Sequence, residues 1–142
     1  MEIIVFVFIF QSDISKITIR KDKECISMAQ INKEVKRVLR DYLIKVQRDI
    51  PVDFAILYGS QAKGQAGPYS DIDIAVFSHT FKNKSHYAAQ VMLQKYLWGI
   101  KADIQPVGYP VEEYSSKNKL DFVGGIIKKE GIVVCRKNKI LI

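Results

Sequence analysis

The chain has 142 residues and a mass of 16.2 kDa, enough for one domain with a hydrophobic core. Hydrophobic residues make up 48% and charged residues 26%, which is ordinary globular composition. The formal net charge is +7. The basic residues are spread along the chain, so the sequence contains no polybasic block or tail. A surface of this kind favours anionic partners in general, a nucleotide triphosphate included, and does not indicate direct nucleic-acid binding.

The N-terminus is strongly apolar, but its pattern is not that of a membrane anchor or a signal peptide. Eight apolar residues, Ile3 to Phe10, fall far short of the roughly 20 needed to cross a bilayer. They follow an acidic residue and precede no small-residue cleavage pattern. A β-branched and aromatic run predicts a strand, and Ile14 to Arg20 could pair with it as a hairpin.

Met28 immediately precedes a well-formed helical pattern. We therefore expect residues 1–27 to be an N-terminal extension, either a β-hairpin or an upstream start that does not belong to the working domain. The domain itself is expected to span residues 28–142.

The next segment predicts an amphipathic helix from Ala29 that ends at Pro51. Apolar residues recur at helical spacing at Ile31, Val35, Val38, Leu39, Tyr42, Leu43 and Val46. Two strands are expected to follow, at 54–58 and 71–77, with a connection at 59–70.

The second half of the chain alternates helices and strands. Ser85 is expected to cap a helix over 86–98, with Ala88, Val91, Met92 and Tyr96 on its inner face. The remaining elements are a short strand at 101–105 closed by Pro106, a turn at 108–110, a helical turn at 111–114, a helix over 120–129 weakened by two glycines and capped by Gly131, and a strand at 132–136. This order predicts an α/β (α+β) fold, a mixed central sheet with helices packed on it.

One short stretch carries the chemistry. Gly59 and Ser60 break an apolar strand, ten residues intervene, and Asp71 and Asp73 then lie at alternate positions of the next strand. Successive side chains in a strand point to opposite faces, so the two carboxylates share one face. Adjacent carboxylates are costly unless something positive lies between them, and Mg2+ takes one or two protein carboxylates plus water and substrate phosphate.

Three further residues could complete such a site. Asp103 is flanked by strand-like residues and could add a third carboxylate if its strand neighbours that of Asp71 and Asp73. The amides after Gly59 could form a phosphate-binding nest, and Lys63 could place a cation near a triphosphate. Three carboxylates can hold two Mg2+ ions for in-line displacement at phosphorus.

These residues resemble the signature of the DNA polymerase β-like nucleotidyltransferase superfamily. The segments from Leu57 to Gly64 and from Tyr69 to Ala75 are most similar to the minimal nucleotidyltransferases of bacteria and archaea. The resemblance covers about Ala29 to Arg136 and implies the polymerase-β-like nucleotidyltransferase fold. It also implies that Gly59 and Ser60 hold nucleotide phosphates and that Asp71, Asp73 and Asp103 bind Mg2+ and carry catalysis.

The resemblance further suggests a biological role. Minimal nucleotidyltransferases are commonly antitoxins that transfer AMP from ATP onto a tyrosine of a HEPN-domain toxin. One alternative is a small-molecule transferase of the aminoglycoside-modifying kind, although such enzymes usually carry a second helical domain for which these 142 residues leave no room. Another is a nucleotide- or partner-binding module with little catalysis. Nucleotide base, acceptor and oligomeric state are not determined by the sequence.

The remaining notable residues have simpler interpretations. Cys25 and Cys135 form no metal or disulfide pattern, which agrees with a reducing compartment such as the cytoplasm. Phe77, Phe81 and Trp98 are expected to be packing residues.

Overall fold

A computed structural model describes residues 28–115 and 121–142 of the chain. The chain divides into a first unit, Met1–Gln30, and a second unit, Ile31–Ile142. Of the first unit, the structure describes a single helical turn at residues 28–30. The hairpin expected in residues 1–27 lies outside the described residues, so the predicted domain boundary at residue 28 stays a prediction. Within the described ranges, no helix is both long and apolar enough for a membrane span.

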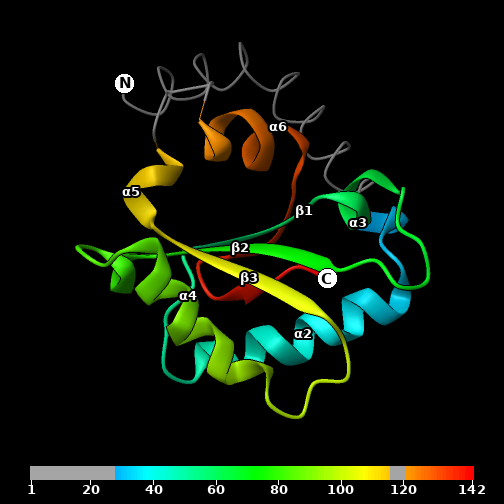
Figure 1. Cartoon of the computed structure of the whole chain (residues 1–142), viewed down its shortest axis with the longest axis horizontal. Coiled ribbons are helices and arrows are strands. Elements are labelled where there is room, and N and C mark those ends of the chain that lie inside the picture. Colours follow the sequence, from blue (N-terminus) through cyan, green and yellow to red (C-terminus); the bar gives the residue numbers. More distant parts are fainter. Residues whose placement is uncertain (1–27, 116–120) are drawn as a thin grey trace, which may run out of the picture. The chain divides into compact units, whose positions relative to one another are not determined.

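The second unit is built on a five-stranded mixed sheet with strand order β3-β2-β1-β4-β5 (Figure 1). The strands are β1 (Phe54–Tyr58), β2 (Ile72–Ser78), β3 (Ile104–Pro110), β4 (Ile132–Arg136) and β5 (Lys139–Ile140). β2 and β3 are parallel, whereas β1 is antiparallel to both β2 and β4. The predicted mixed sheet is therefore confirmed, with β5 as an additional short strand.

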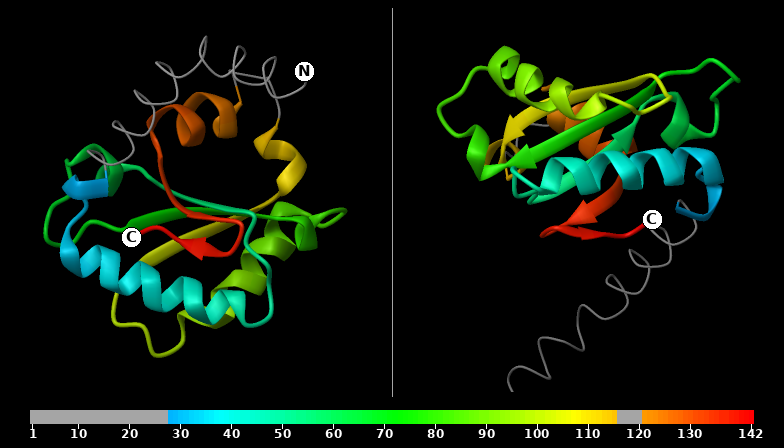
Figure 2. Two further views of the ribbon diagram at one scale, coloured as in Figure 1. Left: turned by 180° about the vertical axis from the view of Figure 1, so that it is seen from behind. Right: turned by 90° about the horizontal axis from the view of Figure 1, so that it is seen from below.

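Helices cover both faces of this sheet (Figures 1 and 2). On one face lie α2 (Lys33–Gln47) and α4 (His86–Gln94), which are joined by a hydrogen bond of 3.1 Å from the Tyr42 hydroxyl to the Leu93 carbonyl. On the other face lie α5 (Val111–Tyr114), a π-helical segment η3 (Val123–Ile127) and α6 (Lys128–Glu130). The sheet is thus enclosed between two helical layers.

Sequence signals explain where the two longer helices begin and what they bury. α2 begins at Lys33 and not at the expected Ala29, because the side chain of Asn32 caps it by accepting from the Glu34 amide at 2.8 Å. Ser85 accepts from the Ala88 amide at 3.1 Å and starts α4, as expected. The apolar stripe of α2 is buried, as predicted. The inner face of α4 was predicted only in part: Tyr96, in the 3-10 turn that follows α4, is buried as expected, but Ala89 and Leu93 are buried on α4 itself and Val91 is 51% exposed.

The third strand differs from its expected position. β3 continues through Pro106 and Gly108 to Pro110 instead of ending at residue 105. Proline is tolerated there because β3 is the edge strand and needs no donor on its solvent side. Gly108 is required by packing, since a Cβ at this position would lie 2.7 Å from the Cβ of Ala89 on α4.

The last helix is also irregular. Gly124 and Gly125 fall in the π-helical segment η3, where a single wide turn replaces the expected α-helix over 120–129. Gly131 ends the helix with extended torsions, φ −80° and ψ 159°, and not in the left-handed conformation typical of a C-cap. Glycine is needed because a Cβ there would collide with the Ile127 carbonyl and the Ile56 side chain.

Replacing Gly108 by alanine should lower the free energy of unfolding by about 1–3 kcal/mol, because α4 must move away from β3 to admit the methyl group. Gly67→Ala is the matched control, since its Cβ would meet nothing closer than Ser70 Oγ at 3.8 Å. Urea denaturation of both variants measures the difference. Equal stabilities would contradict the close approach of α4 and β3.

Candidate active site

Strand pairing brings three distant chain segments to one end of the sheet. Because β1 and β2 are antiparallel, Tyr58 at the end of β1 lies opposite Asp73 near the start of β2. Because β3 is parallel to β2, its start lies there as well, and the Ile72 amide donates to the Asp103 carbonyl at 2.8 Å. Gly59, which follows β1, and the three predicted aspartates therefore meet at the same edge.

The carboxylates also share a face of the sheet. Asp73, Ala75 and Phe77 occupy every second position of β2, so their side chains lie on the same face of the sheet. Ala75 and Phe77 belong to the core cluster that includes Val123 and Ile127 of η3. By the same alternation Asp71 lies on this face. The candidate site is thus the polar end of the face covered by α5, η3 and α6, where the apolar core gives way to solvent.

The aspartates interact strongly with one another. The hydrogen bond between the Asp71 and Asp103 side chains, followed by the charge of Asp103, raises the pKa of the Asp71 carboxyl. Partial burial, followed by the charges of Asp71 and Asp103, raises the pKa of Asp73. The charge of Asp103 therefore disfavours the ionisation of both Asp71 and Asp73, as expected for carboxylates that share a site without a counter-ion.

Their donor atoms fit a hard divalent cation. Among the residues that the structure describes, no three His, Cys, Asp or Glu side chains form a preformed metal cluster, so the three aspartates do not yet make a closed three-ligand site. Mg2+ does not require one, since it takes one or two carboxylates and completes its shell with water and substrate phosphates. The hydrogen-bonded Asp71 and Asp103 and the adjacent Asp73 supply that oxygen-rich donor set.

Gly59 allows the chain to turn directly over Asp73. Its torsions, φ 72° and ψ −153°, belong to a region that is essentially restricted to glycine. A Cβ at this position would lie 2.5 Å from Asp73 Oδ2. The close approach of backbone and carboxylate therefore depends on the missing side chain.

A short helix, α3 (Ser60–Lys63), follows this turn. The amides of Ala62 and Lys63 both donate to the Gly59 carbonyl at 3.2 Å. As at any helix start, the amides of Ser60 and Gln61 have no acceptor within the helix. The predicted phosphate-binding residues Gly59 and Ser60 thus lie next to the aspartates.

Lys63 has a partner that the sequence did not reveal. Its Nζ lies 2.7 Å from Oε2 of Glu130 on α6, so the lysine links α3 to the last helix. To contact a phosphate, Lys63 would have to exchange this carboxylate for the nucleotide. Its assignment as a phosphate ligand stays a prediction.

Sequence reasoning missed two residues beside the aspartates. Gln105 donates from Nε2 to Oδ1 of Asp103 at 2.7 Å, and its position two residues after Asp103 on a strand was the available signal. Tyr58, the last residue of the apolar strand β1, lies opposite Asp73. Burial, then the charge of Asp73, raises its pKa to about 12, so its hydroxyl stays protonated at neutral pH.

Comparisons with known proteins agree with this geometry. A family model described as a nucleotidyltransferase domain matches residues 35–134. A crystal structure from Sulfolobus solfataricus, of a protein provisionally assigned as a nucleotidyltransferase, superposes with a TM-score of 0.54 at 15% identity. The alignment covers 84% of this chain and 92% of the other, and shows a shared fold. No curated protein matches the sequence.

The raised pKa of Asp73 predicts that its charge costs stability in the absence of metal. An unfolded aspartate ionises near pH 3.9, and a higher folded value means that stability is lost as the pH rises between the two values. Asp73→Asn should therefore raise the melting temperature at pH 7 in EDTA, and the gain should shrink towards about pH 4.

Added Mg2+ should reverse the order by stabilising the wild type more than the variant. Glu112→Gln, which removes an exposed carboxylate outside the site, should give no such gain. A variant less stable than the wild type in EDTA at pH 7 would contradict the repulsion among the aspartates. Scanning calorimetry measures both effects.

Proposed function

The chain belongs to the nucleotidyltransferase domain family, and from this premise we propose that it transfers AMP from ATP, with Mg2+, to an acceptor hydroxyl. The acceptor that we propose is a tyrosine of a cognate HEPN-domain toxin, which the modification would silence, so that the chain acts as an antitoxin. The general activity, nucleotidyl transfer, follows from the family. The donor, the metal and the acceptor are the proposed parts.

One observation carries the proposal. Asp71, Asp73 and Asp103 interact with one another at the sheet edge where Gly59 turns the backbone over Asp73. Carboxylates gathered in this way are suited to a divalent cation, and the adjacent start of α3 is suited to phosphate oxygens. Nucleotidyl transfer requires these two features side by side.

The proposed reaction is an in-line displacement at phosphorus. The oxygen of the acceptor hydroxyl attacks the α-phosphorus of ATP, the bond from this phosphorus to the oxygen that bridges to the β-phosphate breaks, pyrophosphate leaves, and the hydroxyl proton passes to water. Mg2+, in the family's manner as one or two ions held by Asp71, Asp73 and Asp103, would neutralise phosphate charge and lower the pKa of the attacking hydroxyl. Positioning and charge neutralisation supply most of the rate.

The chain's own residues have separable tasks in this scheme. The backbone from Gly59 to Gln61 would hold phosphate oxygens through amides without helical acceptors. Gln105 would hold Asp103 in one orientation through its hydrogen bond. Tyr58 would border the site as a protonated neighbour of Asp73, which suits it to donate a hydrogen bond and not to accept a proton.

The protein acceptor is proposed from the similarity of the segments 57–64 and 69–75 to minimal nucleotidyltransferases. The surface near the site is compatible with a macromolecular acceptor. Phe122 packs edge-on against Tyr58 with ring centroids 5.7 Å apart, and it is 47% exposed. Tyr69, in the connection before Asp71, is 96% exposed. Exposed aromatic side chains of this kind are common anchors in protein interfaces.

Incubation with labelled ATP, Mg2+ and the proposed HEPN-domain partner should place label on that partner. Asp71→Asn and Asp73→Asn should each reduce transfer by at least about 100-fold while the fold is retained. Asp103→Asn should impair transfer more than ATP binding. Lys84→Gln, an exposed change away from the site, is the matched control.

Separate outcomes would refute separate parts of the proposal. Transfer to a small aminoglycoside and not to the protein would replace the acceptor. ATP binding without transfer to any acceptor would make the chain a nucleotide-binding module. Equal loss of binding and transfer in Asp103→Asn would remove the catalytic role of that residue.

Gln105→Ala should reduce the turnover number by about 10-fold with little change in the KM for ATP, because only the orientation of Asp103 is disturbed. Gln105→Asn, with a shorter amide that cannot reach Asp103 in the same way, should resemble alanine. Steady-state kinetics at saturating Mg2+ separates the two constants. A rise in KM with an unchanged turnover number would indicate that Gln105 contacts the nucleotide instead.

A further inference from the structure

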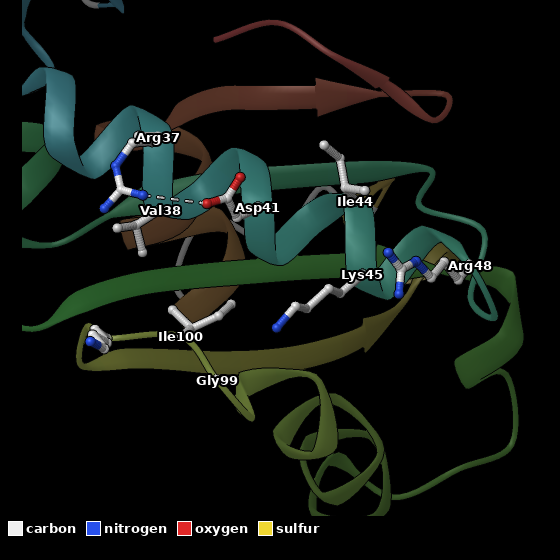
Figure 3. A pocket seen from close by; sticks show the side chains of 9 residues that line it. Arg37, Val38, Asp41, Ile44, Lys45, Arg48, Gly99 and Ile100 are labelled. Carbon is white, nitrogen blue, oxygen red and sulfur yellow. Dashed lines mark ion pairs between the residues drawn. The ribbon is translucent and has the colours of Figure 1, made fainter.

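A second concave surface lies on α2, on the other side of the sheet from the aspartates. A cavity of about 350 Å3 lies between α2 and the loop at residues 98–101, which precedes β3 (Figure 3). We call it the α2 groove; α2 lines it with one stripe from Arg37 to Arg48, and the loop with Gly99, Ile100 and Lys101. At 1.5 Å per residue the stripe is about 16 Å long, which matches about five residues of an extended peptide.

The groove carries positive charge that the protein leaves unneutralised. Arg37 is paired with Glu34 and lies 3.7 Å from Asp41, so its charge is balanced. In the part of the chain that the structure describes, Lys45, Arg48 and Lys101 line the groove without a carboxylate partner. Lys45 donates instead to the carbonyl of Trp98 at 2.7 Å. Three cations along one groove favour an anionic ligand.

Apolar side chains lie among these cations. Trp98, expected to be a packing residue, is 89% exposed beside the groove, and Ile44 is 45% exposed. Gly99 holds the loop in shape with φ +79°. Val38 and Ile100 form apolar wall between the charged side chains (Figure 3). Tryptophan and arginine side chains are enriched among the residues that contribute most to protein–protein binding, so an exposed tryptophan next to unpaired basic residues is typical of a protein interface.

We propose that the α2 groove binds an acidic, partly apolar peptide segment of a protein partner. An extended segment presents alternate side chains on one side, so about five residues can bring two or three carboxylates to Lys45, Arg48 and Lys101. An apolar residue of the segment packs on Trp98 and Ile44. Nucleic acid fits less well, because Asp41 in the groove wall would lie against a continuous phosphate backbone.

This binding site is independent of the transfer chemistry. α2 packs on the opposite face of the sheet from the core cluster that adjoins the aspartates. The groove is therefore open to a partner whether or not a nucleotide is bound. A partner held there need not be the acceptor of AMP, and the test below does not depend on catalysis.

The test is selection from a displayed library of random octapeptides on the full chain. The enriched peptides should carry Asp or Glu together with an aromatic or aliphatic residue. Labelled copies should bind with an anisotropy change that weakens as salt is raised. Trp98 is the single tryptophan of the chain, so its intrinsic fluorescence should change as the peptide binds.

Matched variants locate the binding. The double variant Lys45→Gln with Arg48→Gln, and separately Trp98→Ala, should each weaken peptide binding by about 10-fold or more. Lys36→Gln, the same change on α2 outside the groove, should alter the affinity by less than about 2-fold. Asp71→Asn should bind the peptide as the wild type does, which separates this proposal from the transfer reaction. Circular dichroism confirms that each variant is folded.

Three results would overturn the proposal. The first is selection without enrichment of acidic residues. The second is full binding by the double variant. The third is tighter binding of an oligouridylate of the same length than of the peptides, with a change in the emission of Trp98 and a loss of affinity in the double variant. This result would make the groove a nucleic-acid site.

Discussion

The candidate active site of this protein depends on the pairing register of three strands. The hydrogen bond with Asp103 and its charge raise the pKa of Asp71, and burial together with the charges of Asp71 and Asp103 raises the pKa of Asp73. These aspartates stay together because β1, β2 and β3 are fixed by ladder hydrogen bonds and by a buried core in which Ile74, Ala75 and Phe77 are fully buried. A slip of one residue would turn the carboxylates to the other face. The apolar part of β2 thus keeps the aspartates at its polar end close together, although this proximity lowers the stability of the folded protein.

Glycines allow the helices and loops to approach that sheet closely. Gly59 brings the backbone over Asp73, Gly108 lets α4 lie against β3, and Gly131 lets the last turn pack on Ile56. The Lys63–Glu130 ion pair then connects the helix that follows Gly59 to the helix that precedes Gly131. Strands, turn and C-terminal helices therefore form one continuous support for the candidate site.

The two faces of the sheet have different roles. The face under α5, η3 and α6 ends in aspartates and in the partly exposed Phe122, and we assign it to the nucleotide and its acceptor. The opposite face is covered by α2 and α4, and the outer side of α2 carries unpaired cations beside an exposed tryptophan. A chain with a net charge of +7 spread along its length thereby concentrates part of that charge in one groove.

The sequence by itself determined most of the elements and the family, since both depend on local pattern. The stripe of α2, the cap at Ser85, and the glycine turn followed by two aspartates at alternate positions are local features, and the last of these indicated the family before any contact was known. The tertiary structure decided what depends on partners distant in the sequence. Pro106 lies inside β3 because β3 is an edge strand, Lys63 meets Glu130, and Gln105 holds Asp103. Trp98, which residue type alone predicted to pack in the core, is 89% exposed.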